Sequence, residues 1–435
     1  MTPRRCLGAA IAMLGLVVLA TDSQATFAPV ASSVQNAAVA PQAEASFSPA
    51  SNQTEIAADG SAASRMTSES NVAASPAAPG VSSSEAETEA LPSSVGLVFN
   101  VVTYGADRSG LQDSTVAIRS AIAAAEAIPG ISTVDFPAGT YLLNDNDGAA
   151  VDFKITGPNT VDVLGAGRLH TKIVEKVGTV AYPGISNPKT VFAFEQTTGN
   201  VFAGLTVDTQ TYNAGDPVHD YGNDTTIEHA TFLGAHNANA FALRVTAVCN
   251  DQPGSPEYGV HRSGNLVHDI ILSGEGTGGN ADLDFSCQWN GRVSNITDTG
   301  WGMAIYIDQN VTVNNYAFTP GIYEKSPPGW YVTDSDYITL NAFVTSGLGG
   351  IIKNPTDVSS HITINHEQMT NPNEYLTVGD AAAVTIANSS IAGLLIAPVV
   401  STNGLTVSDS SIGSVTCKTR AGASITGLVG VSCGD

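Results

Sequence analysis

The sequence predicts an all-β chain wound as a solenoid, and three observations support this fold class. Only 13% of the 435 residues are charged, and Gly contributes 43 residues against 3 for Trp. This composition suits many short strands separated by turns better than a helical bundle or a coiled coil. In addition, short runs of β-forming residues ending near Asn, Ser or Gly recur about every 20 to 40 residues, as in a coil repeat with insertions.

The first elements of the folded part are a short strand and one helix. A strand is expected at residues 99–103. Asp113 and Ser114 are good N-cap residues, and the apolar positions that follow have the spacing of one helix face. These positions are Ile118, Ala121, Ile122 and Ala125. Pro129-Gly130 ends the helix, and further strands follow at residues 133–136, 161–167, 201–207, 226–232, 266–272, 311–315, 338–344, 362–365 and 384–391.

The N-terminal residues 1–25 read as a secretory signal peptide. Arg4 and Arg5 precede an apolar run at residues 6–20, and Ser23-Gln24-Ala25 fits a cleavage site. The run is too short for a spanning helix, and no other stretch is long enough, so we expect no membrane span. The sequence therefore predicts a secreted, extracellular protein, with association to a cell surface left open.

Residues 26–96 are rich in Ala, Ser, Pro, Thr and Glu and show no apolar period. A stretch of this kind cannot bury enough apolar surface to offset its ordering entropy. We therefore interpret it as a disordered linker. The remaining residues 97–435 form the predicted folded domain.

The charge balance restricts the partners. The chain has 17 Lys and Arg against 40 Asp and Glu, a net charge of −23. Nucleic acids and anionic membranes are bound through basic residues, so both are excluded as expected partners. An acidic polysaccharide is still compatible, because a local basic cluster or a bridging Ca²⁺ can overcome the overall field.

Four cysteines follow the predicted signal peptide. An even number in an exported chain permits two disulfides, and sequence order favours Cys249–Cys287 and Cys417–Cys433. A metal site is the weaker interpretation, because no C-x-x-C pair is present.

A block at residues 99–143 carries a family resemblance. It contains Tyr104-Gly105-Ala106, then D-S-T-V-A-I-R-S-A-I at 113–122 and V-D-F-P-A-G-T-Y at 134–141. This block resembles the opening of the pectate lyase superfamily, in its rhamnogalacturonase- and epimerase-like branch. The resemblance implies a right-handed, single-stranded parallel β-helix with a short N-terminal capping helix, acting on or binding to a polysaccharide. It leaves the oligomeric state open, with a homotrimer as one arrangement.

A second set of strands, which we align at residues 241–245, 281–287, 302–308, 329–334 and 349–354, predicts a working face. Strand residues alternate between faces. The apolar inward set is then Leu243, Leu283, Phe285, Ile305, Ile307, Val332 and Ile352. The outward set is Arg244, Asp282, Asp284, Tyr306, Asp308, Thr333 and Lys353. Outward residues lie about 4.8 Å apart on neighbouring strands and about 6.7 Å apart along one strand. Carboxylates at these distances suit acid and base roles around one sugar ring. A solvated outer face without function is the alternative.

Within this face, Asp282, Asp284 and Asp308 are the candidate acids and bases of a hydrolase. Lys353 or Arg244 would hold the substrate, and Ile351-Ile352-Lys353 is similar to the closing R-I-K of the related hydrolases. Tyr306 and Trp330 are candidate substrate contacts. Trp289, Trp301 and Trp330 could stack on sugar rings, with packing in the core as the alternative. Ca²⁺ between the three Asp residues fits ligand chemistry, although no calcium-loop pattern supports it and no cofactor is certain.

A second constellation precedes the strand at residues 226–232. It comprises Tyr212, Asp216-Pro217-Val218-His219-Asp220-Tyr221 and Asp224. It is similar, with one residue inserted, to the D-P-H-E motif of uronan C5-epimerases, which also carry a Tyr shortly before it. The resemblance implies proton abstraction from a uronate, which needs a base beside a positive group or a neutralised carboxylate. His219 or Tyr212 could be the base, and Lys353 or Arg244 could also take part in the proton transfer. An acidic loop with a turn-forming Asp-Pro is the alternative.

Three functions therefore stay open. The chain is predicted to be a secreted glycoside hydrolase or polysaccharide lyase on a pectin-like or uronate-containing glycan. A uronan C5-epimerase is an alternative. The third is a non-catalytic glycan-binding adhesin on a long tether.

Overall fold

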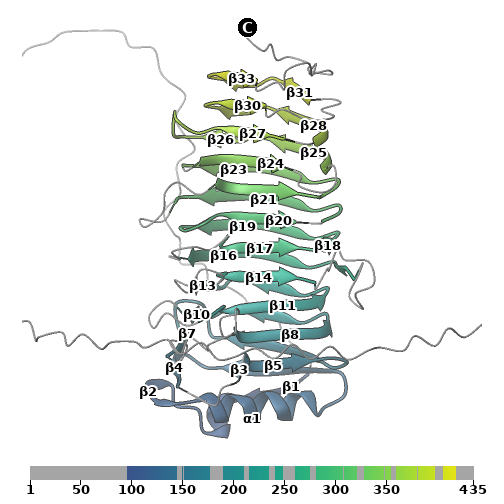
Figure 1. The fold of residues 1–435 in the computed structure, drawn as a ribbon. Helices are drawn as coiled ribbons and strands as arrows, with labels where there is room; N and C mark the ends of the chain where they lie inside the picture. The colour runs from purple at the N-terminus through teal and green to yellow at the C-terminus, as the bar shows by residue number, and fades with distance from the viewer. Residues whose placement is uncertain are drawn as a thin grey trace, which may run out of the picture. The chain divides into compact units, whose positions relative to one another are not determined.

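The computed structural model describes residues 96–144, 149, 151–176, 190–209, 215–234, 241–247, 260–274, 281–306, 308–320, 328–346, 348–353, 359–379, 381–396 and 405–417. Within these residues the chain winds into parallel coils that stack along one axis (Figure 1). The predicted right-handed parallel β-helix is confirmed.

The lower end of the stack in Figure 1 is closed by the single described α-helix. The chain reaches it through β1 (Leu97–Asn100), the 3-10 helix η1 (Val101–Tyr104) and β2 (Ser109–Asp113). The helix α1 (Thr115–Glu126) buries the four predicted apolar positions, so the expected capping helix is confirmed. Asp113 provides its cap, because Asp113 Oδ1 accepts a hydrogen bond from Thr115 N at 3.0 Å.

One side of the stack is an eleven-stranded parallel sheet, here called sheet B. Neighbouring strands of sheet B come from successive coils. In order along the axis it contains β5 (Val151–Thr156), β8 (Thr190–Thr198), β11 (Val218–Asn223), β14 (Leu243–Thr246), β17 (Leu283–Ser286), β20 (Met303–Tyr306), β22 (Pro328–Thr333), β24 (Leu348–Lys353), β27 (Leu376–Val378), β30 (Leu394–Ile396) and β33 (Val415–Cys417).

The other strands form a twenty-stranded parallel sheet, here called sheet A. It begins as two rows, which merge because β12 and β13 both pair with β16. After β1, the first row contains β3 (Ile131–Phe136), β6 (Thr160–Gly165), β9 (Val201–Ala203) and β12 (Thr226–Glu228). After β2, the second contains β4 (Gly139–Leu143), β7 (Thr171–Glu175), β10 (Thr206–Asp208) and β13 (Thr231–Gly234).

The merged strands of sheet A are long and bend once along their length. They are β16 (Leu266–Gly274), β19 (Arg292–Asp298), β21 (Thr312–Phe318) and β23 (Thr339–Thr345). Later coils split again into β25 (Ser359–Asn365), β28 (Ala381–Ala387) and β31 (Leu405–Ser408), beside β26 (Gln368–Met369), β29 (Ser390–Ile391) and β32 (Ser411–Ile412). A separate pair contains β15 (Arg262–Ser263) and β18 (Gln288–Trp289).

The interior of the coils is a continuous apolar core. Because the strands are parallel and in register, similar side chains lie over one another in successive coils. Phe153 and Phe192 do so with ring centroids 5.0 Å apart, and Tyr316 and Phe343 do so at 5.1 Å. The predicted inward set is confirmed wherever it is described, since its side chains are fully buried. These are Leu243, Leu283, Phe285, Ile305, Val332 and Ile352.

Two columns of bends, in which one residue of a coil takes a left-handed backbone, run along part of the described stack. The first column of such residues runs through His229, Asp269, Asn295, Asn315, Ala342, His366, Asn388 and Asp409, with φ between 48° and 57°. The second contains Asn290, Asn310, Tyr337 and His361, with φ between 55° and 58°. Asn and Asp tolerate this conformation, and in the first column Asn315 donates to Asn295, which donates to Asp269.

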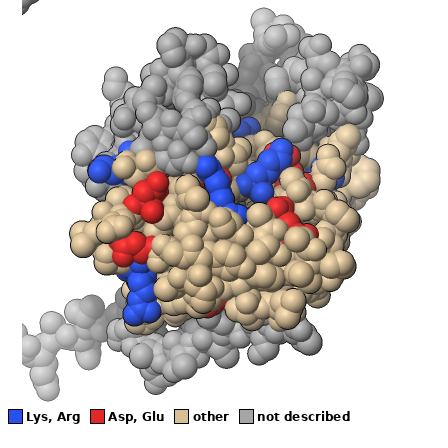
Figure 2. Space-filling view, turned by 90° about the horizontal axis from the view of Figure 1, so that it is seen from below, with Lys and Arg blue, Asp and Glu red and all other residues tan. Residues whose placement is uncertain are grey.

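The charge of the chain is not gathered at the capped end. Figure 2 looks onto this end and shows Asp and Glu in small separate groups among uncharged residues. Within the described ranges, no helix has both the length and the apolar character needed to cross a membrane.

Candidate functional site

Strands β11, β14 and β17 follow one another in sheet B (Figure 1). A row of polar side chains crosses their outer face, because the strand register places His219, Arg244 and Asp284 side by side, one from each successive coil. Neighbouring strands lie about 4.8 Å apart, so Arg244 is within contact distance of His219 on one side and of Asp284 on the other. The alternation of strand residues puts them opposite the buried apolar positions.

Arg244 is held in place by two contacts. Its Nε donates to Asp284 Oδ2 at 3.0 Å, and its guanidinium carbon lies 4.7 Å from the centre of the Phe241 ring. Ser286 donates its hydroxyl to the other oxygen of Asp284. Burial alone would lower the pKa of Arg244, but the carboxylates of Asp284 and Asp216 raise it on balance. The result is a fixed cation on a half-buried surface.

His219 is buried and uncharged. Its side chain is 6% exposed, its ring lies 3.9 Å from that of Tyr221, and its Nε2 has no hydrogen-bond partner. Burial, with the neighbouring Arg244, holds the pKa of His219 well below its usual range. A neutral imidazole with an uncommitted nitrogen can accept a proton.

Asp216 lies beside this row. Its Oδ1 accepts a hydrogen bond from Phe241 N at 2.8 Å, and the residue is 2% exposed. Burial raises the pKa of Asp216 to about 7, a rise that Phe241 N and Arg244 oppose and Asp284 supports. Asp216 can therefore exchange a proton near neutral pH.

A small apolar cluster, separate from the core, adjoins these polar groups. Phe241, Ala281 and Ala304 form it, and the partly buried Tyr331 packs against it. Ala304 and Tyr331 continue the same outward row as Asp284, on β20 and β22. Burial raises the pKa of Tyr331, and the charge of Asp284 adds to the rise. Charged groups and an apolar surface with a phenol thus meet on one face, as in many ligand sites.

The structure brings together four of the predicted site residues, namely Asp216, His219, Arg244 and Asp284. Tyr306 lies at the next outward position, at the end of β20, where its backbone pairs with Ser286 and Thr333. Lys353 is the last residue of β24, and its side chain lies outside the described part of the chain. Tyr212 also lies outside the described residues.

Asp282 does not share the outer face with Asp284, which corrects the predicted alignment. It lies in the bend before β17, is 2% exposed, and accepts a hydrogen bond from Gly274 N at 2.9 Å. A Cβ at Gly274 or Gly300 would come within 1.8 or 2.0 Å of its carboxylate, so glycines are needed around it. Burial raises its pKa well above the usual range, and the charge of the adjacent Asp298 adds to this.

Asp308 and Asp220 are also buried structural groups. Asp308 Oδ1 accepts from Gln288 N in the turn after β20, and the residue is 3% exposed. Asp220 accepts from Gly222 N at 2.8 Å within β11. Asp282, Asp284 and Asp308, which were considered for Ca²⁺, do not form a group with ligand spacing. Among the described residues, the one group of three or more His, Cys, Asp or Glu with ligand spacing lies elsewhere.

Trp330 points into the core and offers no surface to a sugar. It is fully buried, and a Cβ at Gly350 would come within 2.0 Å of its ring. Its Nε1 donates to Glu367 Oε1 at 3.4 Å. Burial raises the pKa of Glu367 to about 8, and the neighbouring Glu374 adds to the rise. Trp330 and Glu367 are thus a buried polar contact of the core.

Trp289 does lie at the surface, at an outer turn of the coils. A hollow of about 440 Å³ is lined by Trp289, Asn290, Gln309, Asn310 and Tyr337. The side chains of Trp289 and Tyr337 are 42% and 52% exposed, and each stacks on a histidine. The partners are His261 and His361, both at 4.4 Å.

The predicted disulfides stay predictions, because Cys249 and Cys433 lie outside the described residues. The sequence prediction included Tyr221 in the group around His219 but missed Ser286 and Phe241 as members of the site. Ser286 follows Asp284 by two residues on one strand, so alternation could have found it.

Comparison with known proteins gives the family. Residues 98–331 match the family described as rhamnogalacturonase A/epimerase, pectate lyase-like. The chain belongs to this family. The match extends beyond the N-terminal block that carried the resemblance, through β20 and into β22, and so includes every described member of the cluster on sheet B.

No curated protein sequence matches the chain. Similar solved structures include the A-module of mannuronan C-5 epimerase AlgE6 of Azotobacter vinelandii (17% identity, TM-score 0.44, 73% of this chain and 79% of that one). A second is PfbA, a surface adhesin of Streptococcus pneumoniae, with 14% identity and a TM-score of 0.47 over 74% of this chain and 91% of that one. A third is tailspike gp49 of Acinetobacter baumannii bacteriophage Fri1, a capsular polysaccharide depolymerase, with 11% identity and a TM-score of 0.41 over 78% of this chain and 64% of that one. These identities are too low to transfer an activity.

Proposed function

We propose that the protein modifies a uronate-containing polysaccharide by removing the C5 proton of a uronate ring at the outer face of sheet B. The observation that carries this proposal is the row of His219, Arg244 and Asp284. It sets a histidine nitrogen without a hydrogen-bond partner beside a guanidinium that a carboxylate holds in place. Membership of a family that includes epimerases supports it.

Each side chain has a distinct task in this reaction. His219 Nε2 takes the proton as the C5–H bond breaks, and the electron pair passes into the substrate carboxylate. Arg244 stabilises that developing charge, and its contact with Asp284 fixes its orientation beforehand. The low pKa of His219 keeps it neutral and able to accept the proton.

The product depends on the step after proton removal. Return of a proton to the opposite face of C5 gives the epimer, for which Tyr212 is the candidate donor. Breakage of the C4–O bond with protonation of the leaving oxygen gives a chain with an unsaturated end. Hydrolysis is the less supported reaction, because it needs two carboxyl groups facing the sugar and two of the three predicted ones are buried elsewhere.

The test incubates the full chain with several uronate polysaccharides in D₂O. Deuterium at C5 is followed by NMR and unsaturated uronates by ultraviolet absorbance. We expect one of these signals, and His219→Gln should reduce it by about 10²- to 10⁴-fold, the usual contribution of a general base. His366→Gln is the control, because His366 is exposed and lies between β25 and β26 of sheet A, outside sheet B. New reducing ends without either signal would refute the proposal in favour of hydrolysis.

Non-catalytic glycan binding is a second candidate function, and the hollow between Trp289 and Tyr337 favours it. Aromatic faces stack on sugar rings, and the amides of Asn290, Gln309 and Asn310 can hydrogen-bond to hydroxyl groups. Trp289→Ala should weaken polysaccharide binding in a pull-down assay, while Tyr104→Ala at the capped end should not. Binding without turnover in any polymer would establish this function instead.

We also propose that residues 1–25 direct export, that residues 26–96 form a tether, and that the two predicted disulfides form after export. The apolar run and the even number of cysteines support this. The N-terminal sequence of the mature protein and peptide mapping without reduction would test it. A mature chain that retains residues 1–25, or cysteine-containing peptides unchanged by reduction, would contradict it.

A further inference from the structure

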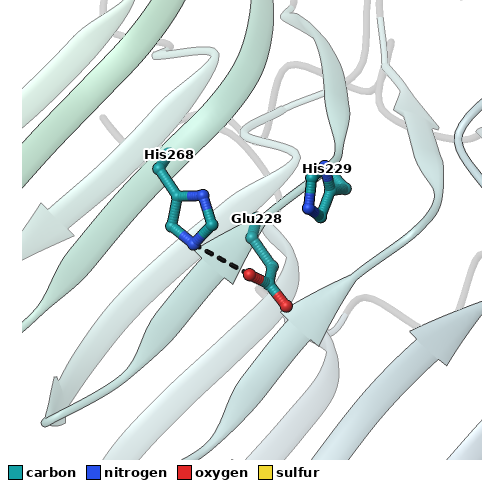
Figure 3. Close-up of side chains that lie close together, drawn as sticks. All are labelled: Glu228, His229 and His268. Carbon is teal, nitrogen blue, oxygen red and sulfur yellow. Dashed lines mark ion pairs between the residues drawn. The ribbon is translucent and has the colours of Figure 1, made fainter. Parts of the chain in front are cut away.

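A compact group of metal-ligand side chains lies on sheet A, on strands that do not belong to the sheet-B site. Glu228 ends β12, His268 pairs with it on β16, and His229 follows Glu228 directly. Figure 3 shows the three side chains converging. Consecutive strand residues normally face opposite sides, but the left-handed backbone of His229, with φ 48°, brings its ring to the same side as Glu228.

The ligand atoms are close to the spacing that a small ion requires. His268 Nε2 lies 2.8 Å from Glu228 Oε2, and one ligand atom from each of the three residues falls within 4.8 Å of the others. Bonds of about 2.0–2.2 Å in a tetrahedral site hold ligand atoms about 3.4 Å apart. Small side-chain rotations therefore suffice, with the backbone unchanged.

The other nitrogen of His268 already has the partner that metal-binding histidines have. His268 Nδ1 lies 2.6 Å from Asp269 Oδ2. Asn295 Nδ2 donates to the other oxygen of Asp269 at 3.0 Å, and Asn315 donates to Asn295 at 2.9 Å. A carboxylate on the far nitrogen fixes the ring orientation and directs Nε2 to the ion. The stack of amides from the next two coils keeps that carboxylate in place.

We propose that Glu228, His229 and His268 bind one divalent transition-metal ion, with Asp269 orienting His268. Two imidazoles and one carboxylate are borderline N and O ligands, which favour Zn²⁺ over Ca²⁺ or Mg²⁺. All three side chains are partly buried, so an ion can enter from solvent and keep a water as its fourth ligand. The ion would tie β12 to β16, strands of successive coils, and is independent of the reaction on sheet B.

The test measures Zn²⁺ binding to the full chain by calorimetry after treatment with a chelator, and follows the melting temperature (Tm). We expect one site and a Tm that rises with Zn²⁺. His268→Gln and Glu228→Gln should each lower the affinity by at least about 100-fold, and Asp269→Asn by about 10- to 100-fold. His366→Gln is the matched control, because His366 occupies the same left-handed column, is exposed and lies outside the group.

Two results would overturn the proposal. One is the absence of binding heat and of a Tm rise in the unaltered chain. The other is an affinity in His268→Gln and Glu228→Gln equal to that in His366→Gln, which would assign the binding to other histidines. Circular dichroism of each variant separates loss of the site from loss of the fold, and Asp269→Asn leaves all three ligands in place.

Discussion

Replacing Glu367 by Gln should reduce the pH dependence of stability. Glu367 is 1% exposed, and its Oε1 accepts from Trp330 Nε1 while its Oε2 has no partner. Burial raises its pKa to about 8 from a usual value of 4.5. Gln preserves the size and the acceptor oxygen but does not ionise.

The direction follows from proton binding. Between the two pKa values the folded state retains the proton and the unfolded state has lost it, so stability falls as pH rises through this window. One pKa unit corresponds to about 1.36 kcal/mol, and the loss levels off near the folded pKa. Between pH 6.5 and 8 the Glu367 contribution is about 1–2 kcal/mol, or about 3 °C in Tm at roughly 2 °C per kcal/mol.

The assay compares Tm at pH 6.5 and pH 8 by calorimetry. We expect the unaltered chain to lose about 3 °C more than Glu367→Gln over this interval. Asp409→Asn, at an exposed position where Asn also tolerates the backbone, should retain the full loss. An equal loss in Glu367→Gln and in the unaltered chain would show that Glu367 does not hold a proton in the fold.

Three further predictions concern the core and the site. Trp330→Ala should cost about 3–5 kcal/mol in the free energy of unfolding, measured by urea denaturation, because it empties a packed position. Arg244→Ala should abolish turnover and lower Tm, since it leaves the Asp284 carboxylate without its cation, whereas Arg244→Lys should restore most of the Tm. If His219 is the base, kcat/KM should stay level as the pH falls from 7.5 to 6.5, where an ordinary histidine would already lose activity.

The fold could be predicted because local patterns determine it. The spacing of β-forming runs and the motif block at residues 99–143 predicted the coils and the capping helix. Alternation within strands then predicted the inward set, including Leu283 and Ile305. The same rule places Trp330 inward, two residues before Val332, so its proposed role in sugar stacking was inconsistent with the strand pattern.

The details of the site depend on features that alternation does not describe. Asp282 precedes β17, where the backbone bends and glycines from two neighbouring segments close over it. Asp308 lies in a turn, and its burial comes from contacts with the preceding coil. The group of Glu228, His229 and His268 depends on a pairing across 40 residues and on one left-handed residue, neither of which a single sequence specifies.

The second left-handed column bears on how such a surface can change over evolution. Asn290, Asn310, Tyr337 and His361 share one backbone conformation although their side chains include amides, a phenol and an imidazole. The strand pairing on either side does not depend on which of these side chains is present. The residue at this position of one coil can therefore be substituted with little effect on the stability of the neighbouring coils. Duplication of a coil adds one more position of this kind. New ligand specificities can accumulate coil by coil on an unchanged scaffold, and a designer could vary these positions as a small combinatorial library.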